Sequence, residues 1–309
     1  MVAIPVCALA ADFDDAADGD WNAGGMDTWG AGVGNFPGAA DNVTIDSHTV
    51  TVTADAEAND LAHSGGSLRI NGGTSLVLYG TNTTFSNHRD MGGGGELVNE
   101  GYMKWDPSGG FTLNMATNGG GAIFLGANHS GIQVGSGSLV NDGLMHIDTG
   151  SNGAHIGGDG EVVNNGLLRV ETSASAGKLE FWYGGKMRGA SGSVTEFDGS
   201  MRFVSGFDPE SGLTVDAGGI LRKTGAGTLS MDGNGSAHMD FRDGGTVEVR
   251  EGTLKCAQKH WYVRYNGSAP GSTLNFRLGI YDMNTRTVPG DKGYVILYIF
   301  KPGTVLTVF

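Results

Sequence analysis

A short turn motif recurs along this chain at nearly regular intervals. It occurs in the segments Gly95–Asp106, Gly137–Asp148 and Gly160–Glu171. In each one a short apolar run ends in asparagine, a polar residue and glycine follow, and a second alternating apolar run begins. Asn99, Asn141 and Asn164 hold the equivalent position, and the first interval is close to twice the second. A unit of about 20 residues made of short strands and polar turns is the signature of a solenoid.

Each part of the motif has a physical role. Asparagine accepts hydrogen bonds from the nearby backbone, and the glycine after it takes a positive φ at no steric cost. One coil cannot bury its apolar side alone, but stacked coils gain parallel strand pairing and a continuous core. We therefore expect an all-β parallel β-solenoid in which equivalent asparagines stack as hydrogen-bonded ladders.

The composition agrees with a chain that turns often and still buries a core. Glycine supplies 56 of 309 residues, against roughly 7% in average proteins, and 39% of the residues are hydrophobic. The alternative is a β-sandwich with ordinary Asn-Gly hairpins, in which turns come about every 8–12 residues between antiparallel partners. Turns at near multiples of one period favour the solenoid.

Charge and terminal sequence bear on partners and compartment. A net charge of −14 repels phosphate backbones, so we expect no nucleic-acid partner. The apolar stretch 1–10 before an acidic segment reads like the end of a secretory signal peptide. The run Tyr294–Phe300 is too short to span a bilayer, so we expect no membrane insertion by this segment.

We divide the chain into four parts. They are a signal-peptide remnant at 1–10, an N-terminal acidic segment and cap at 11–55, the β-solenoid at 56–265, and the last strands at 266–309. Within the second part, Asp12–Asp20 holds five carboxylates in nine residues. We expect a charged, mobile tail there, with a bound cation as the alternative. The final run Gly303–Phe309 reads like an interrupted strand, as in a fragment of a longer protein.

Residues 221–255 resemble the autotransporter-associated β-strand repeat. That family reads Lys-Thr-Gly-x-Gly-Thr-Leu, a variable polar stretch, then Gly-Gly-Thr-x-Val and Gly-Thr-Leu. The matching positions are Lys223, Thr224, Gly225, Gly227, Thr228, Leu229, Gly244, Gly245, Thr246, Val249, Gly252, Thr253 and Leu254. The linker Asp232–Asp243 departs from the usual Asn-x-Tyr-x-Gly wording.

The N-terminal region is similar to a module common at the front of bacterial surface β-helices. Trp21 and Trp29 precede Pro37, and the strand-like runs Asp41–Ile45 and Thr49–Thr53 follow. We expect the two tryptophans to cap the first coil, with a sugar-stacking platform as the alternative. Together the two resemblances imply an exported, single-stranded, right-handed parallel β-helix of the passenger type, secreted or on a bacterial cell surface.

A catalytic site has to be considered because parallel β-helices include polysaccharide lyases and glycosidases. Such a site needs clustered carboxylates, or a cation with a basic residue, on adjacent coils. The candidates are Asp148 with Glu171, and more loosely Glu180, Arg188 and Glu196. An acidic solenoid yields such groupings by chance, and the histidines show no metal-ligand spacing. We expect no enzyme, no cofactor and no metal site.

The functional prediction is an exported structural or adhesin-like surface solenoid, a passenger or stalk that displays loops. The candidate display loops are Thr81–Gly95 and Thr117–Gly131, and Trp182 and Tyr183 are the candidate contact residues for glycan stacking. Cell-surface glycans or extracellular matrix are the expected partners. The alternative is a carbohydrate-active β-helix enzyme, lyase-like or glycosidase-like.

Overall fold

The protein is represented by a computed structural model, and all secondary structure in its described residues is β-strand. The described residues are 10–22, 27–32, 34–86, 92–93, 95–106, 111–113, 116–118, 122–125, 131–134, 138–149, 153–172, 177–182, 184–205, 211–231, 238–242, 245–256, 263–265, 287–289 and 295–298.

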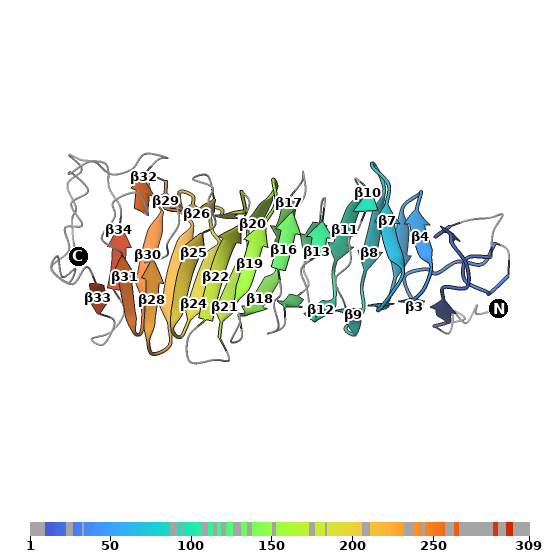
Figure 1. Ribbon diagram of the computed structural model, residues 1–309, viewed down its shortest axis with the longest axis horizontal. Coiled ribbons are helices and arrows are strands. Elements are labelled where there is room, and N and C mark those ends of the chain that lie inside the picture. Colours follow the sequence, from blue (N-terminus) through green and yellow to red (C-terminus); the bar gives the residue numbers. More distant parts are fainter. Residues whose placement is uncertain are drawn as a thin grey trace, which may run out of the picture.

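The strands form a stack of coils with three sides. From β3 (Asn42–Ile45) to β32 (Val263–Tyr265), successive strands enter sheet A, then sheet B or D, then sheet C, and the cycle repeats. Sheet B supplies the second side in the first coils, and sheet D supplies it from β13 (Phe111–Leu113) onward. Figure 1 shows the resulting elongated molecule, with strands crossing its long axis, β3 toward one end and β30 (Thr246–Val249) toward the other.

Sheet A contains β1 (Asp12–Asp14), β3 (Asn42–Ile45), β6 (Leu61–His63), β9 (Thr83–Ser86), β12 (Tyr102–Asp106), β15 (Ala122–Leu125), β18 (Leu144–Asp148), β21 (Leu167–Glu171), β24 (Val194–Asp198), β27 (Ile220–Thr224), β30 (Thr246–Val249) and β34 (Val295–Tyr298). Sheet B contains β2 (Gly19–Asp20), β4 (Thr49–Val52), β7 (Ser67–Ile70) and β10 (Gly92–Gly93).

Sheet C contains β5 (Ala56–Ala58), β8 (Ser75–Leu78), β11 (Glu96–Asn99), β14 (Ala116–Asn118), β17 (Ser138–Asn141), β20 (Glu161–Asn164), β23 (Lys186–Gly189), β26 (Gly212–Val215), β29 (His238–Phe241) and β32 (Val263–Tyr265). Sheet D contains β13, β16 (Gly131–Val134), β19 (Ala154–Gly157), β22 (Gly177–Trp182), β25 (Met201–Ser205), β28 (Thr228–Met231), β31 (Thr253–Cys256) and β33 (Thr287–Pro289).

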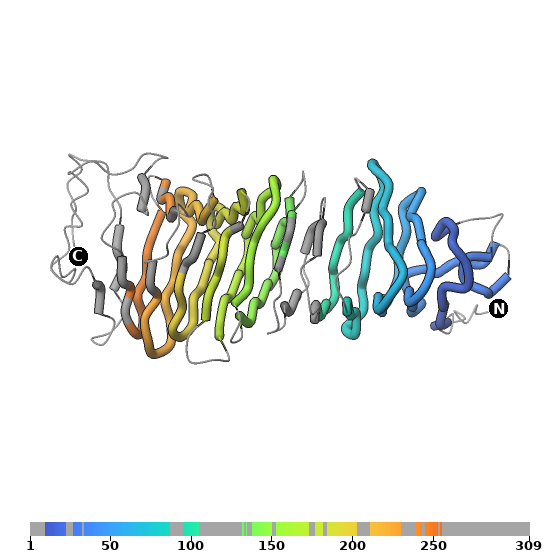
Figure 2. The backbone as a smooth tube through the Cα atoms, viewed as in Figure 1, coloured from blue at the N-terminus to red at the C-terminus, as the bar shows by residue number. Residues whose placement is uncertain are grey.

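Strand pairing confirms the parallel β-solenoid and excludes the β-sandwich. Neighbouring strands from β1 to β32 pair in parallel, and only β34 with β30 and β33 with β31 run antiparallel among the described pairs. The register gives the coil length directly, because Val43 lies beside Leu61 in an early coil and Arg169 beside Glu196 in a later one. From β3 onward the predicted period therefore holds for the early coils, whereas later coils are longer. The first coil is an exception and is also long, because Asp12 lies beside Asn42. Figure 2 follows the backbone through this stack.

Alternating side chains fill the interior of the stack. In sheet A one inward column includes Ile45, His63, Phe85, Ile147, Val170, Phe197, Lys223 and Val249. All eight are buried, and six are apolar. Fully burying such an apolar side chain stabilises the fold by about 1.5–3 kcal/mol, so the columns hold each coil onto the next.

The repeated asparagines form the predicted ladder inside the corner between sheets C and A. Asn99, Asn118, Asn141 and Asn164 stand in register on four successive coils. The side chains of Asn99, Asn141 and Asn164 are buried. Asn141 Nδ2 donates to Asn164 Oδ1 at 2.7 Å, and Asn164 Nδ2 donates to the Val194 carbonyl at 2.9 Å. The amide suits this column because it is both donor and acceptor.

The glycine of the motif has a different role from the predicted one. Gly101 and Gly166 are not among the glycines with positive φ. A Cβ on Gly101 would lie 1.9 Å from the carbonyl oxygen of Gly80, and one on Gly166 would lie 2.3 Å from that of Gly143. Glycine is therefore required because the coil below passes too close for any side chain.

The N-terminal tryptophans lie inside the first coils. Trp21 is fully buried and Trp29 nearly so. Their rings meet edge to face with centroids 5.0 Å apart, and Phe13 packs edge to face on Trp29 at 6.3 Å. Trp29 Nε1 also donates to the Trp21 carbonyl at 2.9 Å. Buried rings fit the predicted capping role, and the sugar-stacking alternative is wrong because neither ring is accessible.

The acidic stretch is also part of the fold, which corrects the prediction of a mobile tail. Asp12 and Asp14 lie in β1, which pairs with β3. Asp15 is buried, and its carboxylate accepts hydrogen bonds from the backbone amides of Asp46, Ser47 and His48. Burial alone would raise the pKa of Asp15, but these backbone hydrogen bonds outweigh it and lower the pKa below its usual value.

The two predicted display loops also contain regular coil. Residues Thr83–Ser86 are strand β9 and Ala122–Leu125 are strand β15, both in sheet A. Each of the segments Thr81–Gly95 and Thr117–Gly131 therefore contains strand, and neither is wholly a loop.

We predict that Asn164→Ala lowers stability by about 2 kcal/mol, because it removes the acceptor of a buried amide. The matched control is Asn165→Ala, since the exposed Asn165 bonds to Asp142 at the surface. Urea unfolding of the purified chain measures both. Equal midpoints for the two variants would contradict a stabilising role for the ladder.

We predict that Asp15→Asn lowers stability at pH 7 by about 2 kcal/mol, because an amide cannot accept three backbone hydrogen bonds as a carboxylate does. The pKa of Asp15 is lowered by folding, so its contribution is complete above the unfolded value near 3.9 and is lost as pH falls through the lower folded value.

The gap between wild type and Asp15→Asn should consequently shrink below about pH 4 in thermal unfolding. The exposed neighbour supplies the control, Asp14→Asn. A gap that stays constant down to pH 2 would argue against the carboxylate as its source.

Candidate functional site

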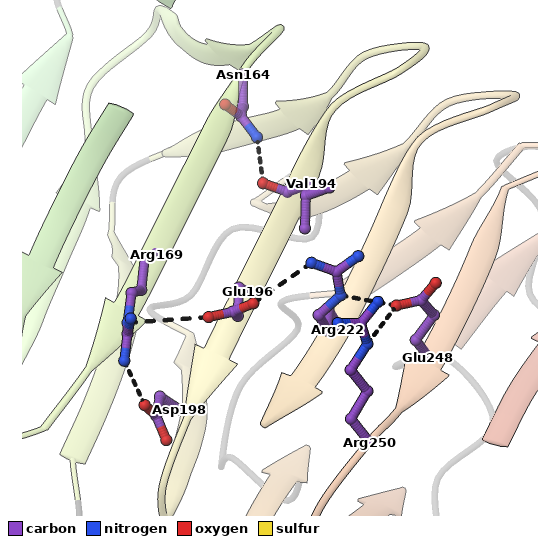
Figure 3. Close-up of polar contacts among 8 residues, drawn as sticks. All are labelled: Asn164, Arg169, Val194, Glu196, Asp198, Arg222, Glu248 and Arg250. Atoms are coloured by element: carbon purple, nitrogen blue, oxygen red, sulfur yellow. Dashed lines mark hydrogen bonds and ion pairs between the residues drawn. The ribbon is translucent and has the colours of Figure 1, made fainter. Parts of the chain in front are cut away.

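The outer face of sheet A carries the densest set of interacting charges in the described part of the chain. One outward column contains His146, Arg169, Glu196, Arg222 and Glu248, joined by the parallel register of five successive strands. We call this column the ionic ladder. From Arg169 onward the sign of the charge alternates from one coil to the next, and Figure 3 shows these side chains reaching along the axis toward one another.

Distances confirm that the ionic ladder is connected. Arg169 Nε lies 3.9 Å from Glu196 Oε1, and Arg222 Nη1 lies 3.5 Å from Glu196 Oε2. Arg222 Nε donates to Glu248 Oε2 at 2.7 Å. Arg250 joins from the next outward position, 3.1 Å from Glu248. Glu196, Arg222 and Glu248 are largely shielded from water, with side-chain exposures of 15%, 16% and 11%.

Two further carboxylates flank the ladder on one side. Asp198 accepts from Arg169 Nη2 at 2.6 Å. Glu171 lies 2.9 Å from His146 Nε2 and 3.5 Å from Arg169 Nε. Ordinary exposed ion pairs contribute about 0–1 kcal/mol each, and networks contribute more reliably. The arrangement therefore stabilises coil stacking and neutralises the face.

The loosely grouped catalytic candidates do not come together. Glu180 lies on β22 in sheet D, Arg188 on β23 in sheet C, and Glu196 on β24 in sheet A. They therefore occupy three different sides of the stack. Arg188 instead pairs with Glu161 at 3.1 Å on its own sheet. The sequence grouping failed because chain proximity does not indicate which side of a coil a residue occupies.

The pair Asp148 and Glu171 is adjacent, as predicted. The two residues are register partners on β18 and β21. Glu171 is engaged with His146 and Arg169. In the described residues this carboxylate thus has basic partners that hold it in the charge network of sheet A.

A buried lysine was missed as a site residue by sequence reasoning. Lys223 is 1% exposed and points inward between Phe197 and Val249 in the register of sheet A. Its Nζ donates to the carbonyls of Thr224 and Gly225. Burial lowers the pKa of Lys223, although the charges of Asp198 and Glu251 act in the opposite direction. The sequence could have indicated this, because Lys223 stands at an inward-facing position in the alternating pattern of strand β27.

Of the two predicted glycan-contact residues, Trp182 falls at a corner of the stack. Trp182 ends β22, with its backbone beside Gly157. Tyr183 lies outside the described residues. Gly184 follows with a φ of 84°, and a Cβ on Gly185 would lie 2.0 Å from the Ile156 carbonyl oxygen, so this corner is tight.

The segment that carries the family resemblance forms two successive coils. Thr228 and Leu229 stand in register with Thr253 and Leu254. The glycines before them, Gly227 and Gly252, both have positive φ. The repeated Gly-Thr-Leu is therefore one structural position used twice.

Two negative findings apply to the described residues only. No group of three or more histidine, cysteine, aspartate or glutamate side chains in them is arranged to hold a metal ion. No helix long and apolar enough to cross a membrane occurs in that part of the chain.

Comparison of the chain with protein-family models, curated proteins and solved structures found no match.

We predict that Glu196→Gln lowers stability by about 1 kcal/mol at low salt, because Arg169 and Arg222 lose their shared carboxylate. The loss should diminish at 1 M salt, where the screening length falls to about 3 Å. The control is Asp159→Asn, at a position away from the ladder. Urea unfolding at both salt concentrations measures the effect, and a salt-independent loss would point to packing rather than charge.

Proposed function

We propose that this protein is an exported structural or adhesin-like solenoid, a passenger or stalk at a bacterial surface, with no catalytic activity. The observation that carries the proposal is the unbroken parallel register of sheet A from β1 to β30. Such stacking makes a long, stiff body whose coils contact only their neighbours. A body of this kind suits extension and display.

Two sequence features support the surface location. The segment 1–10 resembles the end of a signal peptide, and residues 221–255 resemble the repeat of autotransporter passengers. A net charge of −14 keeps a long β-structure soluble. The test is protease treatment of intact source cells, followed by fractionation. Digestion of the chain on intact cells is expected, and complete protection until lysis would refute surface display.

Glycan contact is the finer part of the proposal, with Trp182 and Tyr183 as the contact residues. Aromatic side chains provide broad apolar faces with a polar edge, which suits sugar rings. On a glycan array the purified chain should bind saturably. Trp182→Ala together with Tyr183→Ala should weaken binding about tenfold or more, equivalent to about 1.4 kcal/mol.

The matched control is Tyr79→Ala, which removes an exposed tyrosine elsewhere on the solenoid. Binding that is unchanged in the double variant, or lost equally in the control, would remove these two residues from the proposal. The same preparations should release no sugar from a panel of acidic polysaccharides. Turnover of any of them would favour the carbohydrate-active enzyme instead.

A further inference from the structure

Asparagine followed directly by glycine occurs six times in the chain, and this dipeptide is the one most prone to spontaneous deamidation. In that reaction the glycine amide loses its proton, and its nitrogen attacks the asparagine side chain. The absence of a Cβ on glycine leaves the path open, so the rate in a folded protein depends on how freely the amide can react. Both residues of the pair are described for Asn71–Gly72 and for Asn165–Gly166.

The pair Asn71–Gly72 lies in an exposed turn between β7 and β8. Asn71, Gly72 and Gly73 are all exposed. Thr74 donates to the Asn71 carbonyl from its backbone amide at 3.1 Å and from its hydroxyl at 2.8 Å. Gly73 has a φ of 82°, as in a type II turn, and a Cβ there would meet no atom within 4 Å.

The amide of Gly72 is the reactive group of this turn. In the part of the chain that the structure describes, no hydrogen bond from this amide is found. Since Gly72 is also exposed, water can reach the amide and remove its proton. The backbone rotation that the attack requires opens the hydrogen bonds from Thr74, which lie within the turn.

The pair Asn165–Gly166 is held against the previous coil. Its two backbone amides both donate to the Asn141 carbonyl, at 2.8 Å and 3.0 Å. The Asn165 side chain donates to Asp142 at 2.7 Å, and a Cβ on Gly166 would lie 2.3 Å from the Gly143 carbonyl oxygen. The same attack at this pair would therefore break hydrogen bonds between two coils.

We propose that Asn71 is a site of spontaneous deamidation in the folded protein and that coil stacking protects Asn165. The deprotonated nitrogen of Gly72 attacks Cγ of Asn71, a new C–N bond forms, and the Cγ–Nδ2 bond breaks with loss of ammonia. Water then opens the cyclic imide at either carbonyl, which leaves aspartate or isoaspartate. Water is the co-reactant, and the proposal does not depend on surface display or glycan contact.

Peptide mapping by mass spectrometry, on the purified chain aged in mildly alkaline buffer, tests the proposal. Asn71 should convert about tenfold faster than Asn165 or more, equivalent to a barrier lower by about 1.4 kcal/mol. The product at Asn71 should separate into aspartate and isoaspartate forms, because direct hydrolysis of the side chain gives aspartate alone.

Two controls separate the fold from the dipeptide itself. In chain unfolded by guanidinium, the two asparagines should react at similar rates, because both precede glycine. Gly72→Ala should slow conversion of Asn71 about tenfold in the folded chain, an increase in the barrier of about 1.4 kcal/mol. Gly72 is not among the glycines with positive φ, so alanine suits its backbone, and circular dichroism checks that the variant folds.

Equal rates for Asn71 and Asn165 in the folded chain would overturn the proposal. A difference that persists after unfolding would also overturn it, because local sequence would then be the cause. Conversion of Asn71 that is unaffected by Gly72→Ala would exclude the attack by the Gly72 nitrogen.

Discussion

Parallel in-register stacking is the constraint on which the rest of this molecule depends. Each side chain has the equivalent side chain of the next coil about 4.8 Å above it and another below. Apolar side chains and amides satisfy this condition with copies of themselves, whereas equal charges do not. The buried ladder of Asn141 and Asn164 and the alternating ladder of Arg222 with Glu196 and Glu248 are two solutions to the same condition.

Two charged side chains are buried where the turn geometry offers them backbone partners. Lys223 stands in the inward column between Phe197 and Val249, at the end of a strand. Its ammonium reaches the carbonyls of Thr224 and Gly225 in the following turn. In the first coil the roles are reversed, because the Asp15 carboxylate accepts hydrogen bonds from three successive backbone amides. Both groups satisfy backbone atoms that a sharp corner withdraws from strand pairing.

The sequence predicted what repeats and missed what depends on contact between coils. The Val-Asn-x-Gly turns were sufficient to predict the solenoid and the stacking of Asn141 on Asn164. The glycine's role was misread because the atom that excludes a side chain from Gly166, the Gly143 carbonyl oxygen, belongs to the previous coil. Coil length also varies along the stack, so sequence spacing could not assign Glu180, Arg188 and Glu196 to their separate sheets.

Parallel stacking also explains which side chains can occupy the outward positions. A coil contacts only its neighbours, so outward side chains can change from coil to coil without disturbing the core. Charged side chains at these positions form ion pairs within the molecule, as Arg222 does with Glu196 and Glu248. An outward position that keeps Leu144, Leu167, Val194 and Ile220 gains little within its own coil, since Asn82 serves equally well in an earlier one. The coil therefore specifies an outward side chain less strictly than an inward one, which must fit between its neighbours in the core.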